Sequence, residues 1–317
     1  MHPLSPIMST NLVITFHVIP SKEWFRETLR TINKVYKFIP ISDIESYYHS
    51  NMRFNNRCHI CFDDGDRSVY EHAFPILKEM NLPATLFMSP QIVCENSNYW
   101  FQDFHDICSS VNRNQIYKAI SEVTGTDVNE INNYAPFSLL KSLQIKNILK
   151  VVNKIKKEHN VRSRQYNMTE DELIEISESN IIEIGAHTMN HPILANESDE
   201  IAEKEIVDSI TGLSGLTGKK VKYFAYPNGI YCLDYTDREM QILKENGIQL
   251  AFGDIGFFNK KLNYFSIPRG GFAGEERERK MWIINKIFLM SVWKKIKSKT
   301  EIIERMEINR TSLFRAI

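Results

Sequence analysis

The chain has 317 residues, of which 43% are hydrophobic and 25% charged, and 39 basic residues balance 39 acidic ones. This ordinary globular composition and length are enough for one large core or two smaller ones. A zero net charge argues against a general nucleic-acid binder, because such proteins usually carry a basic excess. The N-terminal residues lack the features of a signal peptide, and no apolar run is long enough to span a bilayer. We therefore expect a soluble, cytoplasmic protein without a nucleic-acid partner.

Strand and helix patterns alternate in the first part of the chain. Apolar runs rich in β-branched and aromatic residues predict strands at 11–17, 59–62 and 84–88, and amphipathic patterns predict helices at 21–32 and 68–80. These strand segments are almost continuously hydrophobic, as in parallel strands that are buried on both faces.

Two of the five cysteines, Cys58 and Cys61, have the C-x-x-C spacing. No second pair follows at the distance of a zinc ribbon. The pair falls in a predicted strand, where residues three apart point to opposite faces. We interpret both as core thiols, which favours a reducing compartment.

Residues 95–165 interrupt the alternation, because their sequence contains no convincing strand pattern. Residues 137–157 predict one long amphipathic helix, with shorter helices before it. We interpret this segment as a helical insertion in one loop, because loops are the usual place for substrate-specific additions.

The alternation resumes after residue 165. A helix at 169–179 opens with a capping box formed by Thr169 and Glu172, and a helix at 234–246 ends before Gly247. This order of elements favours a parallel α/β architecture, and we expect a barrel. The remaining predicted strands are 181–187, 222–227, 250–254 and 264–268.

Residues 281–299 combine an apolar body, two tryptophans and five lysines without an acidic residue. One interpretation is an interfacial helix that favours anionic lipid and gives a peripheral membrane contact. The other is a helix that packs on the outer face of the barrel. We expect residues 1–274 to form the barrel domain and residues 275–317 a C-terminal helical extension.

Six predicted strands end in residues that are able to take part in chemistry. In parallel β/α folds, functional side chains gather at the C-terminal ends of the strands. Turn preference alone does not account for six such ends. The residues are His17, Asp63 with Asp64, His187 followed by His191, the segment Tyr226-Pro227-Asn228-Gly229, Asp254 and Arg269.

The pair Asp63-Asp64 has two interpretations. One is a polar turn after a buried strand. The other joins one aspartate with His187 and His191 as three ligands of a divalent metal, with zinc favoured and cobalt, nickel or iron as alternatives. The second carboxylate is then free to act as a base, because such a metal lowers the pKa of water from about 15.7 to about 7.

Three segments in this order, CFDDG, HTMNH and FAYPNG, resemble the first three motifs of the polysaccharide deacetylase (NodB-homology) family. The resemblance covers about residues 11–273 and is nearest in pattern to the poly-N-acetylglucosamine deacetylases. It implies a distorted (β/α) barrel of about seven strands, which agrees with the strand count above. It also implies removal of N-acetyl, O-acetyl or N-formyl groups from sugars.

The resemblance assigns roles to individual residues. It implies that Asp63 is the catalytic base and that Asp64, His187 and His191 hold the metal. It also implies that a backbone N–H group near Tyr226, within the segment that includes Pro227 and Gly229, helps to bind the oxyanion.

The sequence departs from the family pattern at two places. The arginine that braces the catalytic aspartate is replaced by Ala225, and Arg269 is our candidate substitute. The L-x-H motif that supplies the general acid is absent, since no histidine follows His191. We nominate His17 as the acid, because some family members place a similar residue on the first strand, with Asp254 as its orienting partner.

We therefore expect a metal-dependent hydrolase that removes a small acyl group from an amino sugar in an oligo- or polysaccharide. Two alternatives remain open: an enzyme acting on a lipid-linked or nucleotide-linked sugar at the inner membrane face, and a non-catalytic carbohydrate-binding relative. Tyr99 and Trp100 are expected either to line a sugar groove or to pack in a core.

Overall fold

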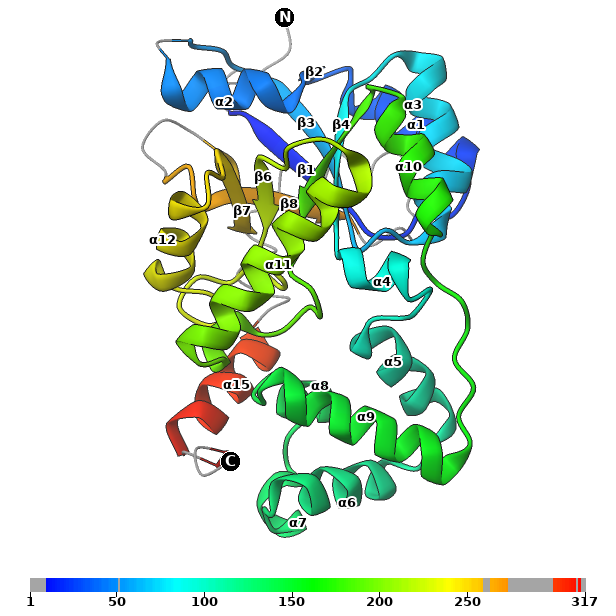
Figure 1. Ribbon diagram of the computed structural model, residues 1–317, viewed down its shortest axis with the longest axis vertical. Helices are drawn as coiled ribbons and strands as arrows, with labels where there is room; N and C mark the ends of the chain where they lie inside the picture. Colours follow the sequence, from blue (N-terminus) through cyan, green and yellow to red (C-terminus); the bar gives the residue numbers. More distant parts are fainter. Residues whose placement is uncertain (1–9, 51, 259–262, 273–298, 312, 315–317) are drawn as a thin grey trace, which may run out of the picture.

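In the computed structural model, seven parallel strands close into a barrel (Figure 1). The structure describes residues 10–50, 52–258, 263–272, 299–311 and 313–314. The strand order β1-β8-β7-β6-β5-β4-β3 is closed by pairing between β1 and β3, which confirms the predicted barrel. The strands are β1 (Leu12–Phe16), β3 (Arg57–Asp63), β4 (Ala84–Met88), β5 (Ile182–Ala186), β6 (Tyr223–Ala225), β7 (Leu250–Ile255) and β8 (Ile267–Phe272).

The barrel is distorted at β6 and β7. The pairing of β5 with β6 has the single register pair Ala186 and Phe224, and the ladder between β7 and β8 shifts between Gly253 and Ile255. A short strand that the sequence did not predict, β2 (Lys37–Phe38), pairs with the first residues of β3 outside the ring.

Side chains alternate between the two faces of each strand, as the pleat requires. In β3, Cys58, Ile60 and Phe62 belong to the core between the barrel and its helices, whereas Cys61 belongs to the core inside the barrel. The two cysteines are thus buried free thiols on opposite faces, as predicted. Asp63 continues the inward-facing set and reaches the C-terminal mouth of the barrel.

Helices surround the barrel, and several of them begin with side-chain caps. Ser21 caps the first helix, and capping boxes formed by Thr169 with Glu172 and Thr236 with Glu239 open two others. These elements are α1 (Lys22–Ile32), α2 (Ile41–His49), the π-helix Val69–Ala73 with α3 (Phe74–Met80), α10 (Glu170–Glu178), the 3-10 helix Leu194–Asn196, α11 (Asp199–Thr217) and α12 (Asp237–Glu245).

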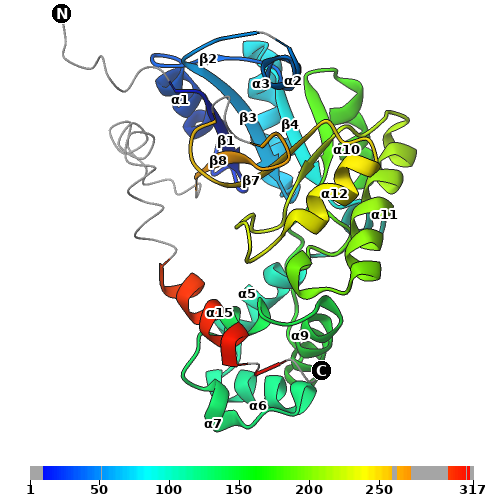
Figure 2. The same ribbon diagram turned by 90° about the vertical axis from the view of Figure 1, so that its left-hand side faces the viewer.

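A second helical layer lies below the mouth of the barrel in Figure 1 and has its own hydrophobic core. It consists of α5 (Trp100–Ser110), α6 (Arg113–Thr124), α7 (Val128–Ile131), α8 (Pro136–Leu140) and α9 (Ile145–His159), and follows the short α4 (Pro90–Cys94). The C-terminal helix α15 (Lys299–Thr311) joins this layer, and its Ile308 is buried in the same core. Figure 2 shows α15 beside these helices from another side.

Two of the differences between the predicted and the observed elements have a clear physical cause. The single helix at 137–157 is wrong, because the chain turns between α8 and α9, where Glu197 Oε1 accepts a hydrogen bond of 2.6 Å from the Ile145 N–H. The last strand starts three residues later than predicted, because the Asn263 side chain accepts from Phe265 N–H and forms a turn.

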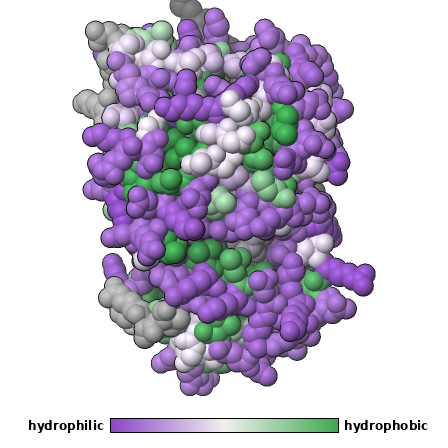
Figure 3. Space-filling view, in the orientation of Figure 1, coloured by the Kyte–Doolittle hydropathy of each residue, from purple (hydrophilic) through white to green (hydrophobic). Residues whose placement is uncertain are grey.

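The surface facing the viewer in Figure 3 is mainly hydrophilic, with separate hydrophobic areas. Within the described part of the chain, none of the helices has the length and hydrophobicity needed to cross a membrane. Apart from Lys299, the segment 281–299 lies outside the described residues, and so does most of the predicted extension 275–317.

Candidate active site

The two carboxylates after β3 sit in a turn that needs left-handed backbone conformations. Asp64 has φ 68° and Gly65 has φ 72°, and Gly65 N–H donates to Asp63 O over 2.8 Å. A Cβ atom on Gly65 would overlap the side chain of Met88, which is buried. Glycine is therefore required both by the backbone and by the packing. The turn places both carboxylates at the mouth of the barrel.

Arg269 and Asp63 form a bidentate ion pair. Its two N–H···O distances are 2.7 and 2.8 Å, and both side chains are buried. The predicted contact is present, although Arg269 belongs to β8 and reaches past β1 to β3. The Phe87 ring lies 5.5 Å from the guanidinium carbon and supports it. Burial disfavours the Asp63 carboxylate, but Arg269 and the nearby histidines outweigh it and lower the pKa of Asp63 to about 2.

Asp64, His187 and His191 form a buried cluster that suits a metal ion. Asp64 Oδ1 lies 3.5 Å from His187 Nε2 and 3.6 Å from His191 Nε2. His187 Nδ1 is 2.7 Å from Ala225 O, which leaves Nε2 to face the aspartate. Among the residues that the structure describes, Asp64 Oδ1 has no hydrogen-bond partner.

The electrostatics of this cluster also fit a cation. Burial, together with the neighbouring Asp63, raises the pKa of Asp64, and burial lowers the pKa of His187 to about 4. Two neutral imidazole nitrogens and a carboxylate that lacks a hydrogen-bond partner are the ligand types that zinc and related metals take. The donor set therefore fits the predicted divalent metal.

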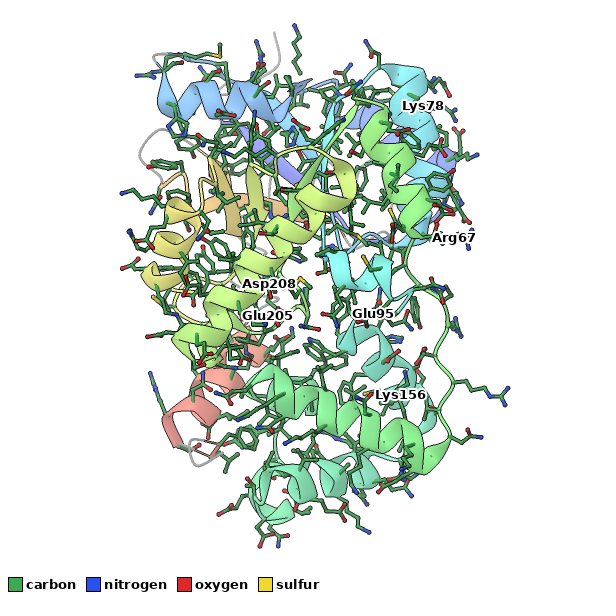
Figure 4. All side chains as sticks on the ribbon, in the orientation of Figure 1. Arg67, Lys78, Glu95, Lys156, Glu205 and Asp208 are labelled. Carbon is green, nitrogen blue, oxygen red and sulfur yellow. The ribbon has the colours of Figure 1, made fainter. Side chains whose placement is uncertain are left out.

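The segment from His187 to His191 is a tight loop rather than a helical turn. Thr188 and His191 have φ 64° and 56°, and Thr188 Oγ1 accepts from His191 N–H over 3.1 Å. Glu205 on α11, labelled in Figure 4, accepts from the N–H groups of Met189 and Asn190 over 3.0 and 2.9 Å. The loop that brings the two imidazoles together is thus held by a carboxylate from a distant helix.

The cluster lies in a pocket of about 380 Å³ that the barrel and the helical insertion line together. Trp100 donates from Nε1 to His191 O over 2.9 Å, and the Phe101 ring lies 4.7 Å from the His191 ring. Trp100 is buried and lines the pocket, so both interpretations raised from the sequence apply to it, whereas Tyr99 is buried and is not a lining residue. No motif or pattern in the sequence had singled out five further lining residues of the pocket: Phe101, Phe137, Lys141, Thr15 and Gly271.

His17 lies at the rim of the same pocket. Its Nε2 is 3.9 Å from Asp63 Oδ2, and 52% of its side chain is exposed. It is therefore near the candidate base and open to an incoming ligand. Its nominated partner Asp254 is part of β7, but the Asp254 side chain lies outside the described residues.

The segment after β6 meets the pocket through Asn228. The Tyr226 side chain points away, since its ring stacks on Tyr235 at 3.6 Å. Its N–H donates to Phe252 O over 2.9 Å, and Gly229 N–H donates to Pro227 O over 2.7 Å. An oxyanion donor in this segment stays a prediction, and these two N–H groups already have partners.

The structure is thus that of a parallel barrel protein with a buried Asp-His-His cluster that could hold a metal ion, beside an ion-paired carboxylate at the strand ends. Residues 55–251 match the family model described as polysaccharide deacetylase, which is more than half of the chain. The chain belongs to this family.

A named relative agrees with this family assignment. The poly-beta-1,6-N-acetyl-D-glucosamine N-deacetylase of Staphylococcus aureus (strain MSSA476) is 30% identical over 126 residues, which are 38% of this chain and 41% of that protein. The match thus spans less than half the length of this curated relative.

Two solved structures share the fold. IcaB from Ammonifex degensii has a TM-score of 0.57 and 18% identity, with 88% of this chain and 97% of that chain covered. The Streptococcus pyogenes deacetylase PplD, solved in complex with acetate, has a TM-score of 0.56 and 16% identity, with 89% and 99% covered.

Proposed function

We propose that this protein is a metal-dependent deacetylase that removes N-acetyl groups from amino sugars of a glycan. The observation that carries the proposal is the Asp63–Arg269 ion pair directly beside the Asp64-His187-His191 cluster, within one pocket. The family assignment and the name of the Staphylococcus relative support an N-acetylglucosamine polymer as substrate.

Asp63 acts as the base. Arg269 holds both carboxylate oxygens and keeps the group ionised, with a pKa of about 2, so the base is available throughout the neutral range. So weak a base cannot deprotonate ordinary water, whose pKa is about 15.7. Asp64, His187 and His191 would hold a divalent metal, for which we propose zinc; when bound, such an ion would lower the pKa of a water molecule and polarise the acyl carbonyl.

His17 donates a proton to the leaving amine. Its position at the open rim, 3.9 Å from the base, allows it to reach the nitrogen of a sugar that enters from solvent. Asn228 is the pocket residue of the segment after β6 and is our candidate for the group that binds the developing oxyanion.

The test is acetate release from oligosaccharides of N-acetylglucosamine with β-1,6 or β-1,4 linkage, with zinc content measured in parallel. We expect about one equivalent of zinc, and a loss of at least about 10³-fold in kcat for Asp63→Asn with zinc still bound. His17→Ala should lose about 10²-fold. His105→Ala, which removes an exposed histidine on α5, should match the wild type.

Zinc binding without acetate release from any of these sugars would favour the carbohydrate-binding alternative. A protein that binds no divalent metal would contradict the assignment of the cluster.

A further inference from the structure

Lys141 brings a charged side chain from the insertion to the pocket. It follows α8, and it lines the pocket together with Phe137 of that helix. The backbone is held in place because Asn196 Nδ2 donates to Lys141 O over 2.9 Å. Lys141 Nζ donates to Glu301 Oε1 of α15 over 2.8 Å. Among the residues that the structure describes, one of the three ammonium N–H donors is thus used, and two remain for other acceptors.

The same helix α15 is fastened to α8 by a second set of contacts. Glu304 Oε2 accepts from Ser138 Oγ over 2.6 Å and from Ala135 N–H over 3.3 Å. Ile308 is buried in the core of the insertion. Helix α15 therefore holds the pocket wall that carries Phe137 and Lys141.

Helix α15 also contacts the barrel segment that follows the pocket residue Asn228. Arg305 Nη2 donates to Asp234 Oδ1 over 2.6 Å, and both residues are buried. Asp234 Oδ2 in turn accepts from Ile230 N–H over 2.8 Å, two residues after the pocket residue Asn228. One helix thus connects the pocket wall that carries Lys141 to the segment that follows Asn228, which lies about 90 residues further along the chain.

We propose that Lys141 is a substrate-contacting residue that selects uncharged sugar units, and that α15 sets its position. This rests on the proposed function, since it names the substrate class of the same pocket. Glu301 neutralises the ammonium charge, so the pair offers N–H donors to sugar oxygens without attracting an anion. The rings of Phe101 and Phe137 beside it provide apolar surface for the C–H faces of a sugar.

The first measurement compares Lys141→Met with the wild type, using an N-acetylglucosamine pentasaccharide. We expect KM to rise about tenfold with kcat within about threefold, as for the loss of one hydrogen bond. Lys141→Arg should recover part of the affinity. Lys156→Met is the matched control, because Lys156 (labelled in Figure 4) pairs with Asp103 in the same insertion but is not a lining residue of this pocket.

The second measurement tests whether the negative charge of Glu301 sets the preference for uncharged sugars. Glu301→Gln leaves the ammonium without its counter-charge, so the ratio of kcat/KM for N-acetylglucosamine 6-phosphate to that for neutral N-acetylglucosamine should rise about tenfold. A purely structural role of the pair would lower the activity on both sugars together and leave the ratio unchanged.

Binding of the pentasaccharide, measured by calorimetry in an Asp63→Asn background, separates this proposal from the proposed function. If no variant releases acetate but Lys141→Met still weakens binding about tenfold, the deacetylase proposal fails and this one stands. If the wild type releases acetate and Lys141→Met leaves KM and binding unchanged, Lys141 is not a substrate contact and this proposal is overturned.

Discussion

Several residues of the site have a positive φ, a backbone conformation that residues other than glycine rarely adopt. Asp64, Thr188, His191 and Asn228 all have φ between 56° and 68°. A non-glycine residue in this region costs free energy, and a β-branched residue such as Thr188 is a true outlier. These conformations are kept because the surroundings hold them, as when Thr188 Oγ1 accepts from His191 N–H. The strain therefore coincides with the candidate metal ligands and the candidate oxyanion segment.

The turn after β3 gives a prediction with an internal control. Gly65 and Gly125 both have φ 72°, but a Cβ atom would overlap Met88 only at Gly65, whereas nothing lies within 4 Å at Gly125. Gly125→Ala should cost about 1 kcal/mol for the backbone alone. Gly65→Ala should cost about 1–3 kcal/mol more because of the overlap. The free energy of unfolding in urea measures both.

Zinc affinity should also fall in Gly65→Ala, because the neighbouring Asp64 is displaced, and it should be unchanged in Gly125→Ala. Equal losses of stability in the two variants would show that Met88 moves aside without cost.

At the scale of whole elements, hydrogen bonds from two helices hold the loop from His187 to His191. Glu205 of α11 binds its N–H groups, and Trp100 at the start of α5 binds the carbonyl of His191. Partners of this kind orient metal ligands and commonly contribute 10–100-fold to metal affinity. The insertion thus affects the candidate metal site directly, in addition to lining the pocket.

Trp100→Phe tests this contact. The change removes the indole N–H and leaves the carbonyl of His191 without its donor, so we expect a loss of about 1–3 kcal/mol of stability and about 10-fold in zinc affinity. Zinc affinity is measured by competition with a chelator. Trp24→Phe is the control, because Trp24 Nε1 is buried and has no hydrogen-bond partner among the described residues. A similar fall in zinc affinity in both variants would argue against the role of the Trp100 hydrogen bond.

Across the whole molecule, the barrel and the insertion are joined by α15. Its Arg305 and the Asp234 of the barrel are both buried, at 1% and 0% side-chain exposure. Taking two charges out of water is costly, and removing one partner leaves the other uncompensated. The stability of the molecule should therefore depend on this pair far more than on its surface ion pairs.

Arg305→Met should lower the free energy of unfolding by about 3–5 kcal/mol. Arg26→Met is the control, because the Arg26–Glu79 pair is also 2.6 Å long but Glu79 is 55% exposed, and it should cost less than about 1 kcal/mol. Adding Asp234→Asn to Arg305→Met should recover part of the loss, because the unpaired charge is removed. Equal effects of Arg305→Met and Arg26→Met in urea unfolding would contradict a dominant role for the buried pair.

The sequence by itself determined the features that are local. The alternation of short apolar runs with capped amphipathic helices predicted a seven-stranded parallel barrel. This was possible because a strand that is buried on both faces is hydrophobic at almost every position of its own segment. The first two motifs predicted Asp63, Asp64, His187 and His191 as candidate site residues, because each motif lies within a single turn or loop.

Only the tertiary structure decided the features that depend on distant residues. The turn that splits 137–157 is held by Glu197, and α15 fastens the wall that carries Lys141. Arg269 was a candidate from its place at a strand end, but its bidentate pairing with Asp63 across β1 depends on how the strands pack. Each of these contacts joins residues more than 50 positions apart in the chain. Their partners are chosen by how the strands and helices pack, and no local pattern of hydrophobicity or turn preference encodes that choice.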